Sequence, residues 1–226
     1  MEISPQGRND RGRNGKVVVT GWDSVTMAKR KQNIIQAPMG ETTVLLHTCC
    51  APCSSAIIEA LLQNGITPVI YYCNPNIYPH EEYEIRKNEC TRYAESLGLE
   101  IVDADYDHEG WLAEMKGLES EPERGGRCLK CFKLRLMSTA RYAQERGIKV
   151  ITTTLASSRW KSLEQINEAG LWACDKTNSP DDLQVIWWDQ NWRKNGLQER
   201  RLQIIKEYDF YNQLYCGCEF SMRKDD

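Results

Sequence analysis

Apolar runs of strand length alternate with amphipathic stretches from residue 42 to residue 215. Five apolar runs predict strands, at 42–47, 67–76, 99–107, 149–158 and 183–190. Stretches with helical periodicity predict helices, at 54–65, 80–98, 109–118, 127–147, 161–176 and 197–215. This alternation predicts an α/β fold with a doubly wound, mostly parallel sheet of about five strands and helices on both faces.

Polar loops follow three of the predicted strands. "HTCCAPCS" follows the first strand, "CNPNIYPHEEY" the second and "ASSRWKS" the fourth. In open parallel sheets, ligands bind beyond the carboxyl ends of the strands. The thiol-rich turn therefore lies where this fold places active sites.

The N-terminal part of the chain has a different character. Residues 1–41 are rich in Arg, Lys, Gly and Asn, with one β-like run at Val17 to Thr20. We interpret 1–41 as a polar basic extension, either a solvated tail or an arm that touches RNA. Residues 42–226 then form the α/β catalytic domain.

Charge and hydropathy narrow the class of protein. The net charge is −3, so a nucleic-acid partner would have to meet a local basic patch. No apolar stretch approaches the roughly 18 to 20 residues of a membrane-spanning helix. The N-terminus also lacks the apolar region of a secretory signal. We therefore expect a cytoplasmic protein with no membrane partner.

Ten cysteines are unusual for that compartment, and seven of them form three clusters. Cys49, Cys50 and Cys53 occupy the first loop. A disulfide between the adjacent Cys49 and Cys50 is improbable given the usual Cα spacing of such bonds. These thiols suggest metal ligation, redox work or nucleophilic chemistry, against the plainer interpretation of small buried hydrophobes.

The second cluster is the C-x-x-C pair Cys128 and Cys131. A spacing of three at the start of a helix puts both side chains on one face, where the helix N-terminus favours thiolates. Together with a second cysteine pair it would complete a four-sulfur set, which suits zinc or a [4Fe–4S] cluster. A vicinal pair makes a poor zinc knuckle, which favours the cluster.

The third cluster is the C-G-C pair Cys216 and Cys218. The pair is able to form a strained, easily reduced disulfide or to ligate a second metal. The other three cysteines lie in strand or helix patterns and are assigned to packing: Cys73, Cys90 and Cys174.

Four motifs, in this order, resemble one enzyme family. They are "LLHTCCAPCS", "YYCNPNIYPHEEYEIR", "RGGRCLKCFKLRL" and "YCGCEFS". The chain from about Thr43 to Ser221 is similar to the cobalamin-independent epoxyqueuosine reductases, the QueH family; the first 40 residues fall outside the resemblance. The resemblance implies a two-electron reduction of the epoxide of epoxyqueuosine, at the wobble position of tRNA, to the alkene of queuosine.

The resemblance also implies cofactors and site residues. Family members carry a [4Fe–4S] cluster with an additional iron ion beside it. Carried over here, the cluster ligands are Cys49, Cys50, Cys128 and Cys131. Some relatives have Asp in place of the third thiol, so Cys53 is the candidate ligand of the extra metal. Cys53, Cys216 and Cys218 are then the candidate catalytic residues.

The partners implied are the tRNA substrate and a one-electron donor such as a ferredoxin or flavodoxin. Five basic residues are candidates for phosphate contacts: Arg86, Arg124, Arg127, Lys133 and Arg135. Four polar residues are candidate proton donors: Tyr78, His80, Asp189 and Tyr215. His47, at the end of a buried strand, is either a satisfied core residue or a functional one.

Other classes of protein compete with this interpretation. A zinc-stabilised RNA-binding protein and a thiol–disulfide redox protein using the C-x-x-C pair both fit the cysteine pattern. An adenylating enzyme of the ATP-pyrophosphatase kind does not, because its phosphate loop needs glycine and "TCCAPCS" contains none.

Overall fold

The structure, a computed structural model, describes residues 34–222, so the Val17 to Thr20 run lies outside the described residues. All strand pairs in its five-stranded sheet are parallel. The strands are β1 (Thr43–His47), β2 (Thr67–Tyr72), β3 (Ile101–Asp103), β4 (Val150–Thr153) and β5 (Ile186–Trp187), in the spatial order β3-β2-β1-β4-β5. The predicted fold class is confirmed.

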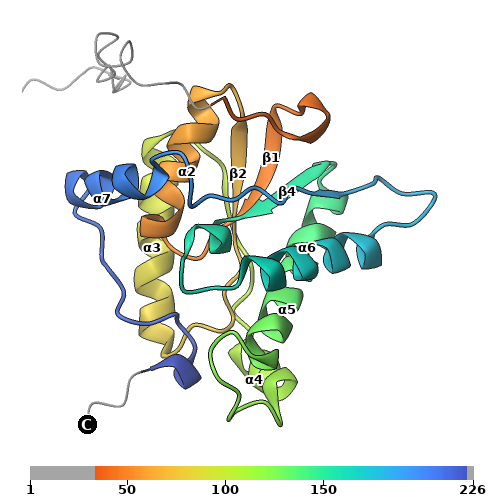
Figure 1. The fold of residues 1–226 in the computed structure, drawn as a ribbon, viewed down its shortest axis with the longest axis vertical. Coiled ribbons are helices and arrows are strands. Elements are labelled where there is room, and N and C mark those ends of the chain that lie inside the picture. Colours follow the sequence, from red (N-terminus) through yellow and green to blue (C-terminus); the bar gives the residue numbers. More distant parts are fainter. Residues whose placement is uncertain (1–33, 223–226) are drawn as a thin grey trace, which may run out of the picture. The chain divides into compact units, whose positions relative to one another are not determined.

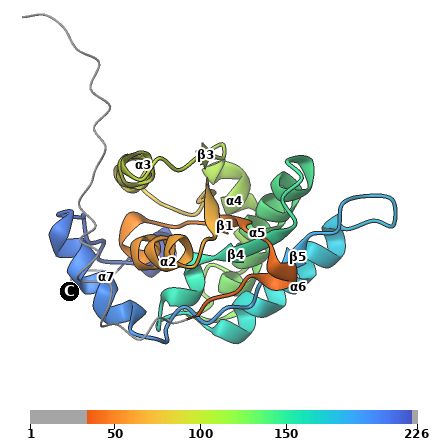
Figure 2. The same cartoon turned by 90° about the horizontal axis from the view of Figure 1, so that it is seen from above.

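Helices cover both faces of this sheet. They are α2 (Ala51–Gln63), α3 (His80–Ser96), α4 (His108–Met115), α5 (Gly126–Glu145), α6 (Leu163–Thr177) and α7 (Leu197–Glu207). Helices α2, α3 and α7 lie on one side, and α5 and α6 on the other (Figures 1 and 2). No helix within residues 34–222 is long and apolar enough to span a membrane.

Several predicted boundaries differ from the structure. Helix α2 begins at Ala51 rather than at residue 54, because Cys50 in an extended conformation caps it and Pro52 occupies its first turn. The last helix ends at Glu207, and residues 208–218 continue without helix. The predicted strands at 99–107 and 183–190 shrink to three and two residues.

The core lies along β1 and the strands beside it. Val44, Leu45 and Leu46 are fully buried because helices cover both faces of this central strand. Two residues of the predicted extension also join the core, since Ile35 and Ala37 are buried against it. The predicted boundary at residue 41 stays a prediction.

The sheet reverses its winding between β1 and β4. From β1 the chain proceeds through α2 toward β2 and β3, and from β4 it proceeds through α6 toward β5 on the other side. The two crossovers leave in opposite directions, which opens a crevice at the carboxyl ends of β1 and β4. Residues 48–53 follow β1, and a 3₁₀ turn, η2 (Thr154–Ser157), follows β4 at this crevice.

Candidate functional site at the β1–β4 crevice

The three thiols of the first motif come together at the N-terminus of α2. The Sγ atoms of Cys49 and Cys50 lie 3.8 Å apart, and those of Cys49, Cys50 and Cys53 all lie within 4.8 Å of one another. Thr154, from the turn after β4, accepts a hydrogen bond from the Cys49 amide (3.2 Å) and donates one to its sulfur (3.5 Å). Both strands of the crevice therefore position this triad.

Hydrogen bonds couple the protonation of the three thiols in the triad. Hydrogen bonds from the Cys50 and Cys53 thiols lower the pKa of Cys49 well below its ordinary value. Donating to Cys49 raises the pKa of Cys50, and that of Cys53 to about 11. Three thiolates this close together repel one another unless a cation lies between them. The arrangement of the triad therefore suits a bound cation.

The second cysteine pair lies on the first turns of α5. Cys128 is half-buried and accepts a hydrogen bond from the Arg124 amide (3.3 Å). Cys131 is buried in a small apolar cluster, and this burial raises its pKa to about 11. The shared helix face predicted from the spacing thus carries one thiol toward solvent and one toward the interior.

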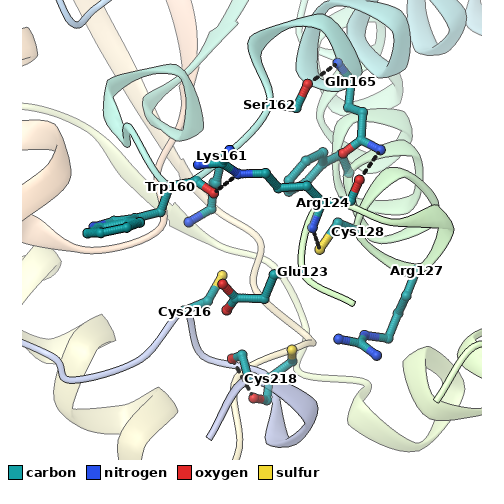
Figure 3. A pocket seen from close by; sticks show the side chains of 12 residues that line it. Glu123, Arg124, Arg127, Cys128, Trp160, Lys161, Ser162, Gln165, Cys216 and Cys218 are labelled. Atoms are coloured by element: carbon teal, nitrogen blue, oxygen red, sulfur yellow. Dashed lines mark hydrogen bonds between the residues drawn. The ribbon is translucent and has the colours of Figure 1, made fainter. Parts of the chain in front are cut away.

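Cys128 faces the C-G-C pair across a small cavity of about 40 Å³. Figure 3 shows Cys128, Cys216 and Cys218 around this space, with Lys161 reaching over it from the loop after β4. Glu123 is the one carboxylate among the described residues that line it. Three segments that are distant in the sequence therefore build the cavity: residues 123–132, residues 160–165 and the C-terminal residues 216–221.

Two cationic side chains, Lys161 and Arg135, interact electrostatically with thiols of more than one cysteine cluster. Lys161 is half-buried, and this burial lowers its pKa. The nearby Cys216, Cys49 and Cys53 raise the pKa by more than burial lowers it, so the net shift is upward. Arg135 is buried, donates to the Cys73 carbonyl (3.1 Å) and to Asn74, and its pKa is raised, against its burial, by Cys131 and Cys49. Thiols of the first motif and of the C-x-x-C pair thus act on the same guanidinium.

The described structure does not gather every predicted ligand into one compact group. The close group is Cys49, Cys50 and Cys53, whereas Cys128 lies with the C-G-C pair and Cys131 lies behind it. Cys216 and Cys218 are free thiols, as are the other eight cysteines, so the structure does not support the predicted disulfide. Cys73, Cys90 and Cys174 are buried, as expected for packing.

Most of the candidate phosphate contacts serve the fold instead. Arg86, Arg127 and Arg135 are buried. Arg127, for example, donates to the carbonyls of Leu118 (3.3 Å) and Glu119 (2.7 Å). Lys133 pairs with Glu168 (2.7 Å). Only Arg124 of the five is an exposed residue lining the cavity.

The candidate proton donors lie outside the lining of the cavity. None of Tyr78, His80, Asp189 and Tyr215 is among the described residues that line the cavity. His47 is a satisfied core residue: its Nε2 donates to the Cys73 carbonyl (3.0 Å), and its Nδ1 accepts from Thr153 (2.7 Å). Burial and the charge of Arg135 lower the pKa of His47 to about 3, which keeps the ring neutral.

Sequence reasoning missed Lys161 and Glu123. Lys161 stands in "ASSRWKS", which was recognised as a loop after a strand, but a single lysine in such a loop carries no signal of its own. Glu123 precedes the Gly-Gly break before α5 and resembles any solvated acid. Only the folding of α5 toward the loop after β4 brings them to the thiols.

Residues 44–224 match the family described as "Epoxyqueuosine reductase QueH", with all three cysteine clusters inside the matched range. This chain belongs to the QueH family. The predicted family is confirmed, and with it the predicted class, an oxidoreductase of tRNA modification.

Proteins named "Epoxyqueuosine reductase QueH" in several bacteria are similar to this chain. The relative from Histophilus somni is 48% identical over 189 residues, which cover 84% of this chain and 76% of that protein. The Haemophilus influenzae relative is also 48% identical, covering 84% and 75%. The relative from Thermotoga maritima is 32% identical over 183 residues, covering 80% and 90%.

The donor set of this QueH chain fits a metal. Thiolates are the ligands that bind iron–sulfur clusters and zinc, and six of the chain's thiols line this crevice or its adjoining cavity. Two sulfurs that share one tetrahedral ion at 2.3 Å lie about 3.8 Å apart, which is the Cys49–Cys50 separation. The nearby Arg135 and Lys161 offset the negative charge of such a thiolate assembly.

Proposed function

We propose that this chain is an epoxyqueuosine reductase that acts on tRNA. The observation that carries the proposal is the QueH match over residues 44–224, together with the Cys49, Cys50 and Cys53 triad at the switch point of the sheet. The reaction opens both C–O bonds of the epoxide. It consumes two electrons and two protons and yields the alkene and one water.

The proposed cluster ligands are Cys49, Cys50, Cys128 and Cys131. The proposed ligand of an additional iron ion is Cys53, which lies against Cys49 and Cys50. Held there, a [4Fe–4S] cluster would supply single electrons, and an iron ion would supply Lewis acidity toward the epoxide oxygen. Cys216 and Cys218 line the cavity and serve as a redox pair or as further ligands.

The cavity supplies groups for the two protons. Lys161 holds a positive charge beside Cys216, so its Nζ–H donates to the oxygen of a bound epoxide. Glu123 supplies the one carboxyl among the described residues that line the same cavity. These two residues replace the donors expected from the sequence.

The substrate nucleotide must leave its stack to reach such a cavity. Arg124 and Arg159 lie at its rim with Trp160, since Arg124 donates to the carbonyls of Trp160 (2.8 Å) and Arg159 (3.0 Å). They form the local basic patch that a chain of net charge −3 needs for tRNA. The proposed electron donor is a ferredoxin or flavodoxin, and the proposed compartment is the cytoplasm, where tRNA acts.

Anaerobic iron and sulfide analysis of single Cys→Ala variants tests the ligand set. We expect C49A, C50A, C128A and C131A each to lose the cluster and the reduction of epoxyqueuosine in tRNA. Cys174→Ala is the matched control, because Cys174 is buried as Cys50 and Cys131 are but lies in α6 as a packing residue. A ligand variant with full iron, sulfide and activity would remove that residue from the set.

A zinc protein is the second candidate, because the Cys49–Cys50 spacing suits a single tetrahedral ion. Stoichiometric zinc in colourless, anaerobically purified protein, without reduction of epoxyqueuosine, would favour it. Stoichiometric iron and sulfide in brown protein would favour the reductase.

A further inference from the structure

Trp111 lies against Cys131 of the second cysteine pair. It stands on α4, its side chain is only 3% exposed, and it packs with Met115 and Cys131. Cys218 and Phe220 of the C-terminal segment cover the same cluster. The indole is therefore held between two thiol-bearing segments, with no room to rotate toward solvent.

The indole Nε1–H of Trp111 is buried and has no hydrogen-bond partner among the described residues. Buried N–H groups nearly always find an acceptor, so an unpaired one calls for an explanation. Two other buried indoles of this chain follow the rule. Trp187 donates to Asn167 (3.3 Å), and Trp192 donates to Thr152 (3.3 Å).

Cys131 is the acceptor that the geometry offers. A neutral thiol is a weak acceptor, whereas a thiolate, free or bound to a metal, is a far stronger one. Cys131 is the buried thiol of the cluster that holds the indole. The buried N–H therefore gains a strong acceptor when the Cys131 sulfur carries the negative charge of a metal ligand.

We propose that the indole N–H of Trp111 donates a hydrogen bond to the Cys131 sulfur when that sulfur ligates the [4Fe–4S] cluster, and so raises the reduction potential of the cluster. The inference rests on the proposed function. A hydrogen bond to a ligand sulfur stabilises the reduced cluster more than the oxidised one, because reduction adds negative charge. Trp111 is a tuning residue that acts through Cys131 and touches no substrate.

Trp111→Phe tests this directly. It keeps an aromatic ring in the apolar cluster and removes the five-membered ring of the indole, which carries the N–H donor. The matched control is Trp187→Phe, which deletes the same atoms in a buried indole that donates to Asn167. Redox titration of the anaerobic enzyme, followed by electron paramagnetic resonance, gives the midpoint potential. We expect W111F to lower it by up to about 59 mV, a tenfold change in the one-electron equilibrium. W187F should match the unaltered enzyme.

Three results have distinct meanings. A fully loaded W111F with the potential of W187F overturns the inference. Absence of a cluster from the unaltered protein overturns the proposed function instead. If W111F does not load, the unaltered enzyme is grown with ¹⁵N-indole tryptophan and its reduced cluster is probed by pulsed electron–nuclear double resonance. A ¹⁵N–H coupling to one indole supports the bond, and its absence refutes it.

Discussion

Removal of the Arg86 guanidinium should release the segment that carries the C-G-C pair. Arg86 is buried on α3, where its Nε donates to Glu82 (2.7 Å). Its two terminal nitrogens reach the carbonyls of Cys216 (3.2 Å) and Tyr215 (3.4 Å). One side chain therefore fixes the backbone of a segment that lies about 130 residues away in the sequence.

The expected cost follows from these contacts. Breaking a buried ion pair by removing one partner costs about 3 to 5 kcal/mol, because the remaining charge stays buried. Here Tyr211 still donates to Glu82 (2.8 Å), so part of that charge remains satisfied. We expect Arg86→Met to lower the free energy of unfolding by about 3 kcal/mol, the lower end of that range.

Two measurements on the reduced, metal-free protein check this. Urea unfolding gives the change in stability. Labelling of thiols followed by mass spectrometry gives the accessibility of each cysteine, and Cys218 should label faster in R86M while the buried Cys174 stays protected. Arg146→Met is the matched control, because Arg146 forms an exposed pair with Glu100 (3.1 Å) worth about 0 to 1 kcal/mol. If R86M has the same free energy of unfolding as R146M and Cys218 is labelled at the unaltered rate, Arg86 does not hold the C-terminal segment in place.

Three further changes test other parts of the structure. Gly170→Ala should lower stability by about 1 to 3 kcal/mol in thermal unfolding, since its Cβ would lie 2.1 Å from the Trp187 ring; an unchanged melting temperature would refute the α6–β5 packing. Lys161→Met should reduce kcat about 100-fold with iron and sulfide retained; a kcat within twofold of the unaltered value would exclude Lys161 as donor. Arg127→Met should speed limited proteolysis at residues 118–121, whose carbonyls Arg127 holds, and equal cleavage rates would contradict that role.

Local patterns were sufficient for the architecture. Runs such as Val44 to Leu46 are apolar on both sides because both faces of a central parallel strand are covered, and this signal needs no tertiary information. The boundaries were less accurate. Tyr208 to Tyr215 read as a continuation of the last helix, yet the chain leaves α7 after Glu207 and runs to Arg86, whose hydrogen bonds take over the backbone carbonyls of Tyr215 and Cys216.

The sequence by itself determined which atoms are chemically able to act, because thiols at the end of a strand and at the start of a helix are visible in the order of residues. It also determined the family, through four motifs in a fixed order. Only the tertiary structure decided which thiols meet, and which cations face them. Lys161 and Arg135 approach the thiols through contacts between residues far apart in the chain, and such contacts leave no local pattern.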